Sequence, residues 1–193
     1  HIGLRSSLPR KRDVLRVSYW GLVRQVEVNQ RLIDALGGDP RFELHYYGRM
    51  QQDGRDMQAY AEQKGYSNVF FHGAYMPTDR YDFAANTDLL HNVYDLGHTT
   101  GNAMGNKYYD GIIFEIPQIC TEDSYMGDLV KQARLGFTFD LNGLNIADSI
   151  WNYYASIDWK EFQKNCAAEL QAIEEEQQDA KDKLLLFIKN DER

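Results

Sequence analysis

Residue types that can bind an anion gather in one glycine-bearing segment, residues 95–110. Gly97, Gly101 and Gly105 recur there among few large apolar side chains, and Lys107 opens an amphipathic helical pattern directly after them. Backbone N–H groups at a helix N-terminus point toward a ligand, the helix dipole favours negative charge, and glycine allows close approach. The segment therefore predicts a seat for phosphate.

Lys107 and Asp110 lie three residues apart on this predicted helix. A lysine near a helix N-terminus is electrostatically unfavourable, so a bound anion would account for it. One turn further on, the Asp110 carboxylate can accept hydrogen bonds from the vicinal hydroxyls of a ribose. A surface ion pair between the two residues is the alternative. Asp95 and His98 in the loop suggest a catalytic pair, but nothing marks a nucleophile beside them.

Two arginines follow predicted strands. Arg24 comes three residues after Gly21, and Arg49 directly follows a glycine at the end of the second strand. A guanidinium at such a position can bind diphosphate oxygens in a bidentate manner. A solvated arginine at a helix start fits Arg24 equally well, and an exposed loop arginine fits Arg49. His72, Gly73 and Tyr75 follow the third strand, where they can flank a base or serve a structural role.

Hydrophobic periodicity predicts the elements that position these residues. Strands are expected at 14–20, 42–48, 67–73, 87–94, 117–120 and 135–140, and helices at 23–36, 54–64, after Pro77, and at 106–115, 124–134 and 144–156. This alternation predicts an α/β fold: a Rossmann-like, doubly wound parallel sheet of about six strands with C-terminal helices. Glycines at strand ends fall at the carboxyl edge of such a sheet, where ligands bind.

The C-terminal third reads as helix. Residues 159–173 space their apolar side chains on one helical face, and the run LLLFI at 184–188 is predicted to dock as a terminal helix. The first residues, 1–13, read as a linker from a missing N-terminal domain, which leaves 14–193 as one Rossmann-like domain with a helical extension.

Composition narrows the function. A formal net charge of −8 and a pI near 5.1 argue against general nucleic-acid binding. Cys120 and Cys166 form no CxxC or metal-like cluster, which favours reduced core thiols. No apolar run is long enough to span a bilayer and no signal peptide is visible, so a cytoplasmic location is expected. The sequence has no GxGxxG fingerprint, P-loop or DxD triplet, and we expect neither cofactor nor metal.

The order of these motifs resembles the C-terminal, nucleotide-sugar-binding domain of GT-B glycosyltransferases, most closely bacterial enzymes of capsular and exopolysaccharide assembly. The resemblance runs from residue 14 to about 190 and is carried by RLIDAL, FELHYYG, NVFFHGAY, NKYYD, IPQI and GFTFD. Each motif is weak alone, but their order and spacing are moderately specific.

The resemblance implies roles for individual residues. In the NKYYD segment Asp110 stands where the family holds the donor ribose, with aspartate in place of glutamate. Arg24 matches one basic residue after the first strand, and Asp95 is the nearest candidate for the acidic residue that opens the glycine loop. The implied donor-binding set is Gly21, Arg49, His72, Gly73, Tyr75, Asp95, Gly97, Gly101, Asn102, Gly105, Asn106, Tyr108 and Asp110, with Arg24 and Lys107 stabilising the leaving group.

The implied activity is transfer of a sugar from UDP-sugar or another NDP-sugar to a glycan or lipid-linked acceptor. The acceptor would be bound by the missing N-terminal domain, which also allows peripheral membrane contact, and the fragment alone would not be competent for transfer. A nucleotide-sugar 2-epimerase of the same fold and a non-catalytic nucleotide- or sugar-binding module are the alternatives.

Overall fold

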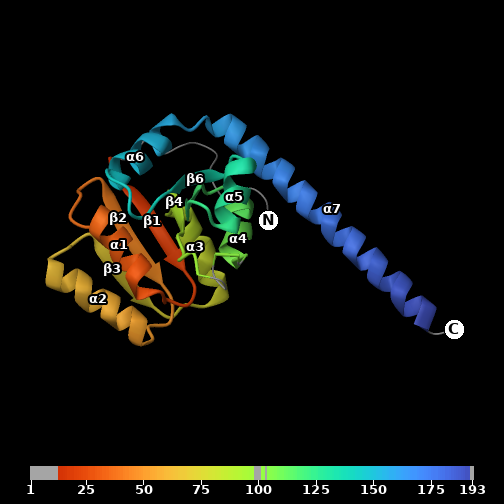
Figure 1. The fold of residues 1–193 in the computed structure, drawn as a ribbon, viewed down its shortest axis with the longest axis horizontal. Helices are drawn as coiled ribbons and strands as arrows, with labels where there is room; N and C mark the ends of the chain where they lie inside the picture. Colours follow the sequence, from red (N-terminus) through yellow and green to blue (C-terminus); the bar gives the residue numbers. More distant parts are fainter. Residues whose placement is uncertain (1–12, 98–100, 103, 192–193) are drawn as a thin grey trace.

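The computed structural model describes residues 13–97, 101–102 and 104–191. It contains one six-stranded parallel sheet in the order β3-β2-β1-β4-β5-β6 (Figure 1). The strands are β1 (Leu15–Trp20), β2 (Phe42–Tyr47), β3 (Val69–Gly73), β4 (Leu89–Asn92), β5 (Gln118–Thr121) and β6 (Gly136–Phe139). Each falls on a predicted strand, and the parallel order confirms the predicted fold class.

Helices connect the strands and extend the chain. They are α1 (Val26–Leu36), α2 (Gln52–Lys64), the 3-10 turn η1 (Pro77–Asp79), α3 (Arg80–Ala85), α4 (Asn106–Ile113), α5 (Tyr125–Gln132), α6 (Ile146–Ser156) and α7 (Trp159–Asp191). Ser124 caps α5 as its sequence position predicts, because its side chain accepts the N–H of Gly127 at 3.0 Å.

The side chains of successive strand residues point to opposite faces of the sheet, so they belong to different hydrophobic cores. Leu89 packs with α1, α2 and α6, whereas the next residue, Leu90, packs with Trp20 and Ala84 on the α3 side. Cys120 of β5 joins α4, α5 and the first turns of α7. The sheet is thus covered on both faces.

The strand order reverses direction between β1 and β4, which are neighbours in the sheet although two strands and the helices around them separate them in sequence. At such a switch point the connections leave in opposite directions and open a crevice at the carboxyl ends of the strands. Gly21 follows β1 there. A Cβ on Gly48, after β2, would lie 1.8 Å from the Gly21 carbonyl oxygen, so only glycine lets these two strand ends approach.

The C-terminal part of α7 departs from the prediction. Phe162 and Cys166 pack against the domain, but Leu184–Ile188 are 47–65% exposed. Figure 1 shows the helix running straight out from the body of the domain. The prediction that LLLFI docks is therefore wrong. No helix in the described part of the chain is long and apolar enough to cross a membrane.

Candidate functional site

A buried ammonium lies at the switch point. Lys107, in the first turn of α4, is only 6% exposed. Its Nζ donates a hydrogen bond to the hydroxyl of Tyr94 and lies 4.0 Å from the ring centroid of Tyr19. Among the described residues, no carboxylate lies within ion-pair distance of this ammonium. Lys107 thus has aromatic and hydroxyl neighbours but no counter-ion.

This environment shifts the protonation of Lys107. Burial lowers the pKa of the ammonium to about 7; the charge of Asp110 acts in the opposite direction, and Arg24 lowers it further. Below the ammonium, burial and the charge of Lys107 together lower the pKa of His91 to about 3. The surroundings of Lys107 and His91 therefore disfavour positive charge.

Gly21 lies next to this ammonium and has a backbone conformation that favours glycine. Its φ of +138° is a conformation that side-chain-bearing residues rarely adopt. A Cβ built there would lie 3.9 Å from the Tyr19 ring and 4.0 Å from Lys107 Nζ. The backbone conformation, and not a lack of space, therefore favours glycine at this position.

A buried polar chain fixes the loop that carries Arg24. Val93 donates its N–H to His91 Nδ1 at 3.1 Å, so His91 is protonated on Nε2 and donates to Asn29 Oδ1 at 2.8 Å. Asn29 in turn donates to the carbonyls of Arg24 and Gln25, at 2.9 and 3.1 Å. The exposed Arg24 side chain is close enough to lower the pKa of Lys107. We call Lys107, Arg24, Gly21, Tyr19 and Tyr94 the anion seat.

The glycine loop closes onto the start of α4. Gly97 donates its N–H to Asp95 Oδ1 at 3.2 Å, and Gly101 donates to the Gly97 carbonyl at 2.7 Å. Gly105 is the N-cap of α4 and offers no side chain to the helix N–H groups. Asn102 and Asn106 are exposed beside it. His98, the second member of the suggested pair, lies outside the described residues.

Asp110 does not form the surface ion pair with Lys107. It is buried, and its Oδ2 accepts the Trp20 Nε1–H at 2.7 Å. Arg80 Nη1 lies 3.2 and 3.3 Å from the two carboxylate oxygens. The carboxylate predicted to be an open ribose acceptor is thus already in contact with two donors.

Tyr108 has a packing role that the donor-binding assignment did not anticipate. Its ring is buried in the α4–α5–α7 core, and its hydroxyl donates to Glu169 of α7 at 2.7 Å. This contact joins α7 to the domain and leaves the side chain facing away from the crevice. The prediction of a donor contact by the Tyr108 side chain is corrected accordingly.

A cavity of about 430 Å³ opens beside the anion seat at the ends of β1, β2 and β3. It brings together three predicted residues, Gly21, Arg49 and Tyr75. Its full lining is Gly21, Leu22, Arg49, Gln51, Ala74 and Tyr75. We call it the β1–β3 cavity. The lining contains three amphipathic or apolar side chains, one guanidinium and one amide, a combination suited to a flat heterocycle.

His72 and Gly73 take other positions. The His72 ring stacks on Tyr47 at 4.2 Å, and its Nε2 lies 3.0 Å from His45 Nδ1. His72 lines a separate cavity between β3 and α2, not the β1–β3 cavity. Gly73 has φ +78° and accepts the Gly48 N–H on its carbonyl. His72 therefore lies apart from Gly21, Arg49 and Tyr75, the predicted donor-binding residues that line the β1–β3 cavity.

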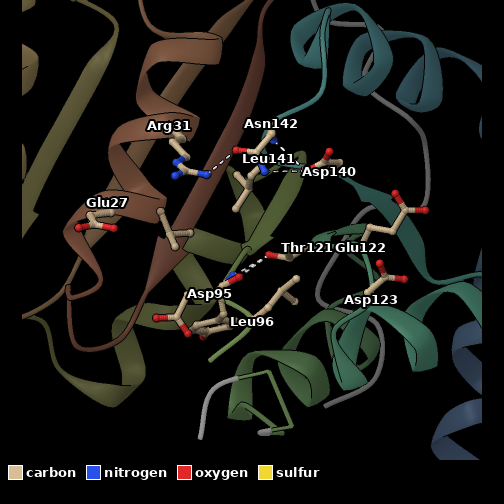
Figure 2. Close-up of a pocket in the computed structure, with 12 residues that line it drawn as sticks. Glu27, Arg31, Asp95, Leu96, Thr121, Glu122, Asp123, Asp140, Leu141 and Asn142 are labelled. Carbon is tan, nitrogen blue, oxygen red and sulfur yellow. Dashed lines mark hydrogen bonds between the residues drawn. The ribbon is translucent and has the colours of Figure 1, made fainter. Parts of the chain in front are cut away.

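A second cavity, of about 360 Å³, lies on the other side of the crevice (Figure 2). Side chains from α1 and from the loops after β4, β5 and β6 converge on it. Five carboxylates line it: Glu27, Asp95, Glu122, Asp123 and Asp140. Arg31 donates to Asn142 Oδ1 at 2.6 Å across its rim. Its carboxylates outnumber its one arginine, and Tyr94, which lines the cavity, also contacts Lys107.

Several solved structures that share this architecture are glycosyltransferases. Anabaena HepE in complex with UDP and glucose superposes with a TM-score of 0.66 at 17% identity, over 88% of this chain and 48% of that one. Sucrose-phosphate synthase from Thermosynechococcus elongatus gives 0.65 at 17%, over 88% and 45%. WaaG, a glycosyltransferase involved in lipopolysaccharide biosynthesis, gives 0.60 at 20%, over 81% and 42%. The chain has the fold of one half of a GT-B glycosyltransferase.

The similarity to these structures is one of fold, and it covers only part of each neighbour's length. No protein-family model and no curated protein matches the sequence. The chain spans less than half the length of each of these three glycosyltransferases. In a two-domain enzyme of this fold the crevice at the carboxyl edge of the sheet would face the other half.

Several neighbours of the anion seat were not found from the sequence. Tyr19 and Trp20 end β1 and Tyr94 follows β4, so their place at the carboxyl edge was a usable signal. Their contacts with Lys107 and Asp110 depend on which face each side chain takes. Arg80 follows a 3-10 turn and carries no sequence signal that links it to Asp110.

Proposed function

We propose that this chain is the donor-binding domain of a glycosyltransferase and that it binds a nucleoside-diphosphate sugar at the anion seat. The observation that carries the proposal is the buried Lys107 ammonium, which lies close to Gly21 and has no carboxylate within ion-pair distance among the described residues. An unpaired buried charge is costly, so it persists where a ligand supplies the partner.

Sugar transfer breaks the bond between the anomeric carbon and the diphosphate oxygen, and negative charge develops on that oxygen. Lys107 and Arg24 would neutralise it, together with the uncapped N–H groups at the start of α4. The departing group needs stabilisation only as the bond breaks, so these cations favour the transition state. In this proposal protein groups alone stabilise the charge, and no metal ion takes part.

Each of the two cavities includes one residue of the anion seat, Gly21 in the β1–β3 cavity and Tyr94 in the acidic one, so the two cavities suit the two ends of a donor. The nucleoside would occupy the β1–β3 cavity against Tyr75, with Arg49 beside it. The transferred sugar would face the acidic cavity, where Asp95 accepts hydroxyl hydrogen bonds. Asp110 would accept ribose hydroxyls on the lone pairs that Trp20 leaves free.

The acceptor is proposed to be a glycan or a lipid-linked sugar in surface polysaccharide synthesis. WaaG, whose structure resembles this chain, is involved in lipopolysaccharide biosynthesis, which supports this class of acceptor. Because the neighbours have more than twice the matched length, a second domain would hold the acceptor and complete the enzyme.

Calorimetric titration with UDP, GDP, ADP and inorganic pyrophosphate tests the donor assignment. We expect saturable binding of a nucleoside diphosphate that is lost or weakened at least tenfold in Lys107→Met, since a charge-assisted contact is worth about 1.5–3 kcal/mol. The matched control is Lys131→Met, which removes an exposed lysine from α5. Equal binding by both variants would exclude Lys107 from the site.

A further inference from the structure

The carboxylate of Asp110 is held by two donors of different character. Trp20 Nε1 lies 2.7 Å from Oδ2 in a buried contact between β1 and α4. Arg80 Nη1, from the start of α3, lies 3.2 Å from Oδ1 and 3.3 Å from Oδ2. The Arg80 side chain is 37% exposed and that of Asp110 is 11% exposed. One contact is therefore enclosed, and the other lies at the surface of the crevice.

These two contacts differ in how readily they break. Removing the buried Trp20 bond would leave a polar group unsatisfied, which folded proteins avoid. An ion pair as exposed as Arg80–Asp110 contributes little, because solvent screens it and the long side chain loses freedom in forming it. Arg80 also donates its Nε–H to the Pro77 carbonyl at 3.2 Å, which holds the stem of the side chain near α3. The guanidinium can thus leave Asp110 while Trp20 stays.

The pair lies next to the proposed donor. Burial raises the pKa of the Tyr75 phenol, and the charges of both Arg80 and Asp110 act on it. Tyr75 lines the β1–β3 cavity, and Lys107 of the anion seat is one helical turn before Asp110. A ligand that spans the cavity and the seat passes this carboxylate.

We propose that Arg80 is a displaceable cap on Asp110 and sets how strongly the site distinguishes ribonucleotides from deoxyribonucleotides. Vicinal ribose hydroxyls replace the guanidinium on Oδ1, while Trp20 keeps Oδ2 in place. A deoxyribose offers fewer donors for this exchange. The free energy gained when ribose hydroxyls bind Asp110 is therefore offset by the free energy lost when the Arg80–Asp110 ion pair breaks. The inference rests on the donor-binding function proposed above.

The variant Arg80→Met tests the cap, since methionine keeps an apolar stem and removes the donors. Titrations compare UDP, GDP and ADP with their 2′-deoxy analogues in the wild-type protein and in the variant. We expect the preference of the tightest-binding diphosphate over its 2′-deoxy form to rise about two- to five-fold in Arg80→Met. Asp110→Asn should reduce that preference below the wild-type value. Arg55→Met, which removes an exposed arginine of α2, should leave it unchanged.

The outcomes separate this inference from the function on which it rests. An unchanged or smaller preference in Arg80→Met, with diphosphate binding intact, overturns the cap and leaves the donor site standing. Absence of binding by every diphosphate to the wild-type protein overturns the donor site and the cap together. A urea unfolding curve of Arg80→Met that matches the wild type shows that the change in preference comes from the site and not from the fold.

Discussion

Diphosphate binding should weaken steeply above neutral pH, because it needs the protonated form of Lys107. Burial lowers the pKa of this ammonium to about 7 in the free protein. About half of the lysine is then charged at pH 7 and about 1% at pH 9. A bound anion favours the charged form, so binding takes up a proton. Affinity should fall about 50-fold between pH 7 and pH 9, where the ligand's own phosphate is already ionised.

The stability of the free protein should change in the opposite direction over the same range. An unfolded lysine has its ordinary pKa of 10.5, above the folded value. Between about pH 7 and 10.5 the unfolded chain therefore binds one proton more than the native state. Stability rises with pH wherever the unfolded state binds more protons. The free energy of unfolding should increase by about 2 kcal/mol from pH 7 to pH 9 through this residue alone.

The assay pairs calorimetric titration of the tightest-binding diphosphate with urea unfolding, each at pH 7, 8 and 9. Lys107→Met should bind weakly at every pH and lose the lysine's contribution to the stability slope. Lys131→Met should reproduce both wild-type slopes. Wild-type affinity that does not fall with pH, or a stability slope that Lys107→Met retains, would refute the reasoning. A change in the overall charge of the protein would not readily produce both trends, a fall in affinity and a rise in stability as the pH increases, and their loss in one variant.

Four further predictions concern the surroundings of the seat. Arg24→Met should weaken diphosphate binding about tenfold and leave the melting temperature unchanged, and Arg55→Met should affect neither. Asn29→Ala should lower the free energy of unfolding in urea by about 2–3 kcal/mol, because it removes the acceptor of the His91 Nε2–H and the side-chain donor of the Arg24 carbonyl; the Gln25 carbonyl keeps the backbone N–H of residue 29. The free energy of unfolding should fall as the pH is lowered from about 6.5 to 3, because His91 becomes protonated in the unfolded chain before it does in the native state. His91→Gln should flatten this slope, and a slope that the variant leaves unchanged would argue against His91 as its source. Deleting residues 178–193 should change the free energy of unfolding by less than about 0.5 kcal/mol, since the described side chains there are exposed.

The strands were predictable because their signals are local. Each combines apolar alternation or a short buried run, and all but β4 have a glycine or proline at one end; all six appear where predicted. The end of α7 was not predictable, because docking depends on the direction of the helix. Side-chain pairs such as Gln171–Glu175 and Gln178–Asp182 support the helix beyond the core. The helix therefore carries Leu184–Ile188 away from the domain.

The sequence predicted at which edge of the sheet the candidate site residues gather, but not which side chains contact one another there. Parallel strands bring their carboxyl ends to one edge, so Gly21, Arg24 and Lys107 were expected together, and the structure places them together. The partners of each charge were beyond the sequence. Whether Asp110 meets Lys107 or Arg80 depends on side-chain directions across three elements, and residue spacing along α4 does not determine it.

The alternation of β1 explains why Lys107 has no counter-ion. Successive strand residues point to opposite faces. Tyr19 turns to the α1 side, and Lys107 reaches over the end of the strand to lie on its ring. Trp20 turns to the α3 side and draws the Asp110 carboxylate there. Lys107 and Asp110 are spaced to form an ion pair across one helical turn, but they are held on opposite faces of the sheet. The separation costs stability at neutral pH and leaves Lys107 without a carboxylate in ion-pair distance among the described residues, which is why we propose that a ligand balances its charge.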